Sequence, residues 1–436
     1  MRKLFLSLVL LLAAAVMPRP ALAALSVDIT QGNFQPLPIA IPDFSTTGAE
    51  GTAGADIAAV VRADLERSGL FRPIDPKAFV DHTSNINAVP NFANWRTISA
   101  QGLAVGSVIA QPDGRLRVEF RLWDVNAASQ IWGQQFSTIP ANWRRIAHMI
   151  SDAIYEHVTG EKGYFDTRIV FISETGTALK RVKRLAIMDQ DGANPNFLTN
   201  GSYMVLTPRF NPTAQMIAYM SYIGAKPRVY LFDIESGKQE VLGNFPNMTF
   251  SPRFSPDGNR VVLTLETGGN SDIYLMDLRN RAVQRLTSDP AIDTAPSFSP
   301  DGRQVVFESD RGGSQQIYVM NLDGSNQRRI SFGPGRNGTP VWSPRGDLIA
   351  FTKQEGSRFN IGVMRPDGSG ERLISSGAGE DEGPTWAPNG RVLMFTRSAS
   401  GGRGSQIWSV DVTGRNERRV LTPGSASDPA WSPLIQ

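Results

Sequence analysis

The chain has 436 residues and a formal net charge of +3, with 44 basic residues against 41 acidic ones. It contains no cysteine, which excludes disulfides and metal sites built from thiolates. A chain of this length can bury a large hydrophobic core and is expected to form two domains.

The first 23 residues have the features of a secretory signal peptide. Arg2 and Lys3 precede an apolar run from Leu4 to Val16, and Ala21-Leu22-Ala23 offers small residues for cleavage before Ala24. The run is too short to span a membrane, and no later stretch approaches about 18 apolar residues. This segment holds three basic residues and no acidic one, so 41 of each remain after cleavage. We therefore expect an exported, soluble chain without the positive field that nucleic-acid binding requires.

The mature chain begins with a short stretch of alternating residue types. Leu25, Val27 and Ile29 are apolar and are separated by polar residues. Two interpretations remain open for this stretch. It is either a frayed terminus or edge strand of its own domain, or a segment that adds to the edge of a partner's sheet.

Residues 24–165 predict a small α/β domain. Leu37 to Phe44 reads as a strand, and Ala55 to Ser68 carries apolar residues at the spacing of one helix face. A hairpin turns at Pro112-Asp113-Gly114, and its second strand alternates apolar and charged residues. A last helix, which Asn142 could cap, ends at Gly160.

The remainder of the chain repeats one motif. A proline, one variable residue and an aromatic residue, followed by Ser-Pro-Asp-Gly or a close variant, recur with a period of 44 residues four times and then 45. The leading prolines are Pro208, Pro252, Pro296, Pro340, Pro384 and Pro429. Periods in this range indicate stacked supersecondary units. We call the proline-to-aromatic tripeptide the anchor.

Each repeat predicts a four-stranded unit. The anchor forms the innermost strand, two β-branched and aromatic runs follow it, and a Leu-Thr-like pair supplies the fourth strand. The first unit, from Ile169, lacks an anchor, whereas the last anchor, Pro429 to Pro433, has no strands after it. The two fragments complete each other and close a ring. The fold class is therefore mainly β: a six-bladed β-propeller over residues 166–436, preceded by the α/β domain.

The repeated motif has a structural explanation. Its aromatic residue can fill the space between blades, the second proline ends the strand, and Asp-Gly supplies the turn. We interpret Ser-Pro-Asp-Gly as a folding signature and not as a catalytic motif.

Catalytic motifs are missing from the sequence. His148 and His157 fall on opposite faces of one predicted helix, His82 stands alone, and there is no Gly-x-Ser-x-Gly elbow. The sequence predicts no catalytic residue and no bound cofactor.

Four carboxylates precede innermost strands and leave alternatives open. They are Asp293, Asp381, Glu382 and Asp428. They form solvated loop charge, a cation site such as one for calcium, or a glycan-cleaving carboxylate pair.

The combination of features resembles the TolB family of the Tol-Pal system. The resemblance rests on the signal, the α/β domain, the six repeats and the terminal Pro429-Ala430-Trp431-Ser432-Pro433. Ala104-Val105-Gly106-Ser107-Val108 and Val158-Thr159-Gly160 also fit the family's pattern. The resemblance implies a non-enzymatic, monomeric periplasmic adaptor that supports outer-membrane integrity and constriction in cell division, and that reaches membranes only through its partners.

The resemblance also implies two partners. The lipoprotein Pal would bind at the mouth of the propeller channel, on loops before the anchors: Met248, Thr249, Ser251, Asp293, Thr294, Asn337, Gly338, Thr339, Asp381, Glu382, Ser427 and Asp428. The C-terminal domain of TolA would bind the mature N-terminus: Ala24, Leu25, Ser26, Val27, Asp28, Ile29, Thr30, Gln31, Gly32 and Asn33. We expect occupancy of the mouth to order or release this segment.

Overall fold

The computed structural model describes residues 25–27, 35–48, 51–81, 85–177, 180–224, 226–399 and 404–435. The chain forms two compact units, Met1–Glu161 and Lys162–Gln436. The signal peptide predicted at residues 1–23, His82 and the loop 400–403 lie outside the described residues. Among the described helices, none combines the length and the hydropathy needed to cross a membrane.

The first unit is built on a mixed sheet with the strand order β3-β1-β4-β5-β6, in which β2 also pairs with β4. Its strands are β1 (Leu37–Ala40), β2 (Ser45–Thr47), β3 (Phe71–Pro73), β4 (Gly102–Ala110), β5 (Leu116–Asp124) and β6 (Ser129–Thr138). β1 is parallel to β3 and β4, whereas β4, β5 and β6 are antiparallel. The predicted alternation holds in β5, where every second residue is buried.

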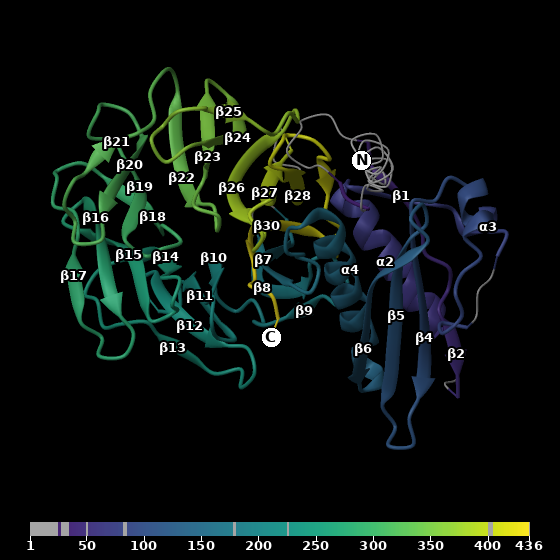
Figure 1. Cartoon of the computed structure of the whole chain (residues 1–436). Helices are drawn as coiled ribbons and strands as arrows, with labels where there is room; N and C mark the ends of the chain where they lie inside the picture. Colours follow the sequence, from purple (N-terminus) through teal and green to yellow (C-terminus); the bar gives the residue numbers. More distant parts are fainter. Residues whose placement is uncertain are drawn as a thin grey trace, which may run out of the picture. The chain divides into compact units, whose positions relative to one another are not determined.

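Two helices, α2 (Ala53–Ser68) and α4 (Trp143–Thr159), pack against each other and against this sheet (Figure 1). Gly69 and Gly160 end them with φ of 75° and 73°, a conformation that glycine adopts without steric cost. The predicted capping bond from Asn142 is not formed, because the chain enters α4 through the 3-10 turn η2 (Pro140–Asn142).

A second hydrophobic cluster of this unit was not predicted from the sequence. It joins Phe79, directly after η1 (Pro76–Ala78), and Phe92 and Trp95 of α3 (Phe92–Thr97) with residues of β1 and β4. Trp95 lies at its centre and contacts Phe79 edge-on, with the ring centroids 5.3 Å apart. The sequence around these residues has no regular apolar period, so the pattern did not reveal the cluster.

The second unit consists of six antiparallel four-stranded sheets. Their strands are β30 (Ser425–Trp431), β7 (Arg168–Thr175), β8 (Val182–Asp189) and β9 (Asn196–Phe197); β10 (Val205–Phe210), β11 (Met216–Ser221), β12 (Arg228–Asp233) and β13 (Gln239–Val241); β14 (Thr249–Phe254), β15 (Arg260–Thr267), β16 (Asn270–Asp277) and β17 (Val283–Arg285); β18 (Asp293–Phe298), β19 (Gln304–Ser309), β20 (Gln316–Asn321) and β21 (Arg328–Arg329); β22 (Arg336–Trp342), β23 (Ile349–Glu355), β24 (Arg358–Met364) and β25 (Arg372–Leu373); and β26 (Glu380–Trp386), β27 (Val392–Ser398), β28 (Ser405–Asp411) and β29 (Arg418–Arg419).

The anchors lie in the innermost strands, as predicted. β10, β14, β18, β22, β26 and β30 each contact their neighbours in turn and form a ring, so the unit is a six-bladed propeller. β30 pairs with β7 and thereby joins the two ends of the propeller chain (Figure 1). Trp431 strengthens this closure, because its indole Nε1–H donates to Thr167 Oγ1 over 2.7 Å.

Each fourth strand ends where the predicted Leu-Thr-like pair begins. The outermost strand β29, for example, is Arg418–Arg419, and Val420 follows it as a buried residue. The hydroxyl of the pair has its own role: Thr287 Oγ1 accepts from Ile273 N over 3.0 Å, and Ser331 Oγ accepts from Ile317 N over 2.8 Å. In these blades the pair therefore closes the sheet with a side-chain bond and is not itself the strand, whereas Leu242-Gly243 and Val420-Leu421 stand at the same place without a hydroxyl.

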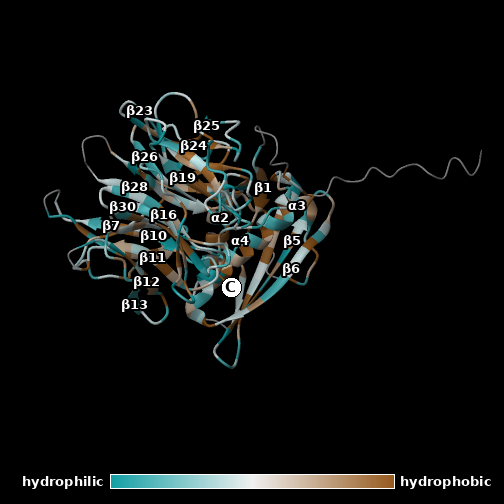
Figure 2. Cartoon of the chain, turned by 90° about the vertical axis from the view of Figure 1, so that its left-hand side faces the viewer, coloured by the Kyte–Doolittle hydropathy of each residue, from teal (hydrophilic) through white to brown (hydrophobic). Residues whose placement is uncertain are grey.

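The anchor aromatics fill the space between blades, as predicted. Phe254 of β14 packs against Ala218 and Leu231 of the preceding blade, and Trp386 of β26 packs against Ile361 and Val363. Burial of one such ring contributes roughly 2–3 kcal/mol. Figure 2 shows hydrophobic residues concentrated in the strands, whereas the connecting loops are mostly hydrophilic.

The Ser-Pro-Asp-Gly copies are structural turns, which confirms their interpretation. Ser299 Oγ donates to Asp301 Oδ1 over 2.5 Å and accepts from Gln304 N over 2.9 Å. Gly302 follows with φ of 68°. The Ser299 hydroxyl holds the pKa of Asp301 below its usual range. Every polar group of the motif is thus engaged within the turn.

Candidate functional site

All six innermost strands carry a β-bulge directly before the anchor. The pairing register shifts there in each blade, for example between Glu382 and Thr385 in β26. The residue before each anchor proline has a positive φ: Thr207 (48°), Ser251 (51°), Ala295 (50°), Thr339 (46°), Gly383 (64°) and Asp428 (50°). We call these six residues the bulge ring.

The left-handed conformation is unfavourable for residues with a side chain, and a following proline disfavours it further. Five members of the bulge ring nevertheless adopt it, and in Thr207, Thr339 and Asp428 a side chain of the preceding blade holds the backbone N–H. Thr339 N donates to Glu308 Oε2 over 2.6 Å, and Asp428 N donates to Thr396 Oγ1 over 2.9 Å. Strained backbone and bulges concentrate at binding sites. The ring is therefore the candidate site.

The residues that we expected in loops before the anchors lie mostly within strands, so that placement is wrong. Met248 precedes β14, and the other eleven belong to the innermost strands themselves. The strands begin before the bulge, because pairing resumes on its far side after a shift of register. The bulge thus separates each anchor from a short first segment of the same strand.

Four of the expected partner-binding side chains are engaged inside the propeller, two with the preceding blade and two within their own blade. Thr249 Oγ1 accepts from Val229 N, and Asn337 Nδ2 donates to Gln316 Oε1. The remaining two are carboxylates in buried ion pairs. Asp293 meets Arg311 Nη2 at 2.7 Å, and Asp381 binds Arg397 through both oxygens at 2.6 and 2.7 Å. These four residues stabilise blades in this structure.

Ser427 is also buried, and its hydroxyl donates to Glu174 Oε1 over 2.9 Å. The other expected residues keep solvent-exposed surface. They are Met248, Ser251, Thr294, Gly338, Thr339, Glu382 and Asp428. The structure therefore brings together a smaller accessible set, most of which belongs to the bulge ring or directly precedes it.

Carboxylates gather on one side of the bulge ring. Burial raises the pKa of Glu382, and the neighbouring charges of Glu380 and Asp428 raise it further. The expected convergence of carboxylates therefore applies to Glu382 and Asp428, whereas Asp293 and Asp381 are bound to arginines. Calcium is bound by clustered carboxylates such as these two. A calcium ion in the propeller channel stays a prediction.

Arginines occupy the next two blades around the ring, beside Asp428, and were missed in the sequence. Arg209 of β10 and Arg253 of β14 stand at the same variable anchor position in adjacent blades. Burial lowers the pKa of Arg253, and the positive charge of Arg209 lowers it further. Burial also lowers the pKa of Arg209, against the opposing effect of Asp428. The sequence does contain a signal for these arginines: the variable position of two adjacent anchors is occupied by a charged residue.

Two family models match this arrangement. The model of the TolB amino-terminal domain matches residues 25–131, and that of the TolB beta propeller domain matches residues 155–435. This chain belongs to the TolB family.

Solved structures agree with the family. The crystal structure of TolB from Acinetobacter baumannii is 28% identical, with a TM-score of 0.82 over 94% of this chain and 99% of that chain. A putative TolB from Agrobacterium tumefaciens is 19% identical over 60% of this chain and 91% of that chain, with a TM-score of 0.49. Hydrazine synthase of Kuenenia stuttgartiensis is 12% identical over 62% of this chain and 47% of that chain, and its TM-score of 0.50 shows a shared fold alone.

Residues 25–27 of this TolB-family chain dock on the first unit. Leu25 and Val27 are buried, whereas Ser26 between them is exposed. Leu25 N donates to Asp124 Oδ2, and Val27 N donates to the carbonyl of Val158, each over 3.1 Å. Ala24 and residues 28–33 lie outside the described part of the chain.

The two described histidines of this TolB-family chain have separate surroundings. His148 Nδ1 lies 2.7 Å from Asp64 Oδ2 in the buried core. His157 stacks on Trp132, with the ring centroids 4.1 Å apart. They do not share a site, as the helical spacing predicted.

Proposed function

We propose that this protein is a non-enzymatic periplasmic adaptor of the Tol-Pal system, which supports outer-membrane integrity and envelope constriction during cell division. One observation carries the proposal: both TolB domain models match in order, from residue 25 to residue 435. The signal peptide expected at residues 1–23 supports export to the periplasm.

The bulge ring is the proposed binding site for Pal. Its hydrogen bonds to preceding blades fix the backbone, and a preorganised site loses little conformational entropy on binding. The ring carries carboxylates at Glu382 and Asp428 and arginines at Arg209 and Arg253. A partner surface with both charge signs would therefore be recognised in one orientation.

The mature N-terminus, residues 24–33, is the proposed binding segment for TolA. Leu25 and Val27 must leave their own domain before a partner's sheet edge can pair with them. Occupancy of the bulge ring would shift the equilibrium between the docked and the released segment. Such coupling is reciprocal, so TolA binding would alter the affinity for Pal by the same factor.

Calorimetric titration of residues 24–436 with the soluble domain of Pal tests the main claim. We expect saturable one-to-one binding that is weakened by Glu382→Arg and Thr294→Arg. The control is Val283→Arg, an exposed position on the outer strand β17, which should bind normally. No binding at about 0.1 mM would leave less than roughly 6 kcal/mol of affinity and would refute the proposal.

The TolA segment is tested by deleting residues 24–33. The deleted chain should lose binding to the C-terminal domain of TolA and keep its binding to Pal. Unchanged TolA binding would exclude this segment as the site. Equal Pal affinity with and without saturating TolA domain would exclude the coupling.

A glycan-cleaving enzyme is the second candidate, and the neighbouring Glu382 and Asp428 are the observation in its favour. A raised pKa suits a general acid beside a second carboxylate. Asp381 is unsuited to this role, because Arg397 occupies both of its oxygens. Turnover of cell-wall glycan that Glu382→Gln abolishes would establish the enzyme and overturn the adaptor proposal.

A further inference from the structure

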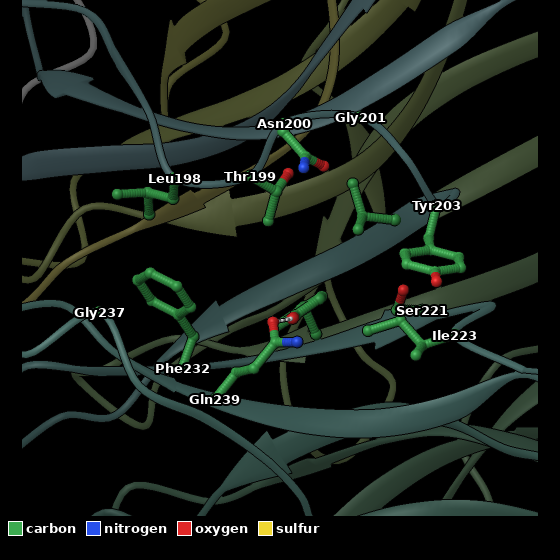
Figure 3. A pocket seen from close by; sticks show the side chains of 12 residues that line it. Leu198, Thr199, Asn200, Gly201, Tyr203, Ser221, Ile223, Phe232, Gly237 and Gln239 are labelled. Carbon is green, nitrogen blue, oxygen red and sulfur yellow. Dashed lines mark hydrogen bonds between the residues drawn. The ribbon is translucent and has the colours of Figure 1, made fainter.

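A pocket lies between the first two blades of the propeller, and none of its lining residues belongs to the bulge ring. Its volume is about 390 Å³, within the range of ligand pockets of about 300–1,000 Å³. The loop after β9 forms one wall, and strands β11, β12 and β13 form the other (Figure 3). None of the lining residues is an acid, a lysine or an arginine.

The pocket exists because this blade junction is less filled than the equivalent ones. Thr199 Oγ1 accepts from Leu185 N over 2.9 Å, which is the bond that Thr287, Ser331 and Ser375 make in later blades. Those three hydroxyl residues are buried, with exposed fractions of 0–5%. Thr199 and the preceding Leu198 are instead partly exposed to solvent.

Two carboxamides face each other across the pocket (Figure 3). Asn200 Oδ1 accepts from Ser202 N over 2.9 Å, and Gln239 Oε1 accepts from the Tyr219 hydroxyl over 2.9 Å. Burial raises the pKa of Tyr219 to about 12, so its hydroxyl remains a donor at neutral pH. Both carboxamides therefore use their oxygens within the protein and offer their NH2 groups to a ligand.

Large apolar side chains surround this opening. Phe197, Tyr203, Met204 and Tyr222 are each 40–51% exposed. Tyr222 N donates to the Met204 carbonyl, which places these two side chains on adjoining segments. Arg184 lies over the Phe197 ring at 5.3 Å. Exposed aromatic residues, methionine and arginine around a pocket are the composition of a protein-interaction hot spot.

The chemistry favours a peptide over a sugar. A sugar hydroxyl both donates and accepts, and the lining lacks the carboxylates that would accept strongly from it. The carbonyls of an extended peptide are acceptors and match two NH2 donors. The buried floor at Val205 and Phe232 is apolar and suits an uncharged side chain.

We propose that this pocket is a second docking site of the propeller, which takes an uncharged apolar or aromatic side chain on an extended segment of a protein partner. Asn200 and Gln239 donate hydrogen bonds to the carbonyls of that segment. The site is independent of the Pal and TolA sites proposed above, since none of its residues belongs to them.

Ligand-observed saturation-transfer NMR on the mature chain tests this proposal. The probes are blocked tripeptides of alanine with a central phenylalanine, leucine, aspartate or lysine, and N-acetylglucosamine. Gln239→Glu keeps an acceptor for Tyr219 and replaces the donor with a carboxylate, so binding should weaken about tenfold, or about 1.4 kcal/mol. Leu198→Trp fills the pocket and should abolish binding. Val283→Ala changes the position one repeat after Gln239 and is the matched control.

The expected result is saturation transfer to the phenylalanine and leucine peptides alone, lost or weakened in the two pocket variants and unchanged in Val283→Ala. Peptide binding that both pocket variants leave intact would overturn the proposal, as would no binding at about 10 mM. Binding of N-acetylglucosamine that Gln239→Glu abolishes would identify a sugar site instead. Glu382→Arg should leave the peptide signals unchanged, which separates this site from the bulge ring.

Discussion

Adjacent carboxylates in β26 have opposite environments, and this contrast gives a sharp prediction. Asp381 is fully buried, and both of its oxygens bind Arg397. Glu382 is the next residue along the strand; its side chain reaches solvent, although the surrounding protein partly desolvates its carboxyl group and raises its pKa. We expect Asp381→Ala to destabilise the propeller strongly, whereas Glu382→Ala should change partner binding with little effect on stability.

The magnitude follows from the contacts of Arg397. Removing one partner of a buried ion pair costs about 3–5 kcal/mol, because the other charge stays buried. Arg397 would retain Glu417 at 2.6 Å and the Trp408 ring at 4.3 Å, so we expect about 3 kcal/mol for Asp381→Ala. Surface substitutions such as Glu382→Ala stay within about 0.5 kcal/mol.

Urea unfolding of the mature chain, followed by tryptophan fluorescence, measures both variants. The chain has two units, so the transition must first be resolved into its propeller component. Arg397→Ala completes a double-mutant cycle, in which the double variant should lose much less than the sum of the single losses. A loss below about 1 kcal/mol for Asp381→Ala, or an equal loss for Glu382→Ala, would refute the reasoning.

Three further predictions concern turns, bulges and closure. The Ser255 hydroxyl lowers the pKa of Asp257, so their hydrogen bond stabilises the fold above about pH 4. This stabilisation is lost as the pH falls through the lower pKa that Asp257 has in the folded state. Ser255→Ala should therefore lower the free energy of unfolding by about 1 kcal/mol at pH 7 and by less at pH 3, as measured from urea midpoints. Gly383→Ala should cost about 1–2 kcal/mol in the same assay through backbone strain alone, because an added Cβ would meet nothing within 4 Å. Truncation before Ser425 removes β30 and leaves β7 paired with β8 alone, so the propeller should lose its cooperative calorimetric transition.

The propeller could be predicted because its information is local and repeated. Each anchor specifies one aromatic between blades, one strand end and one turn, and the constant spacing aligns these elements around the ring. Trp431 illustrates the closure: its anchor has no following strands, and the structure supplies them from Ile169 onward. Such pairing of distant ends is predictable, because no other segment completes the two half-blades.

The orientation of the site residues could not be predicted, because it depends on a bulge. Side chains alternate between the faces of a strand, so one extra residue reverses the assignment of every position beyond it. Asp381 and Glu382 were given one role because both were placed in a loop; as consecutive residues of β26 before the bulge, they face opposite environments. The only sequence hint was Gly383, the single glycine before an anchor proline, since the other five copies place ordinary residues in the same left-handed conformation.

The proposed adaptor combines a rigid site with an easily released one. The bulge ring is held by hydrogen bonds from blade to blade, whereas the described N-terminal residues are held by two buried side chains and two backbone bonds. Burial of Leu25 and Val27 contributes roughly 1.5–3 kcal/mol each. The ordering of the released chain offsets part of this gain. The net cost of release is then comparable with a coupling energy of about 1–3 kcal/mol, so a partner at either site has enough binding energy to shift the N-terminal equilibrium.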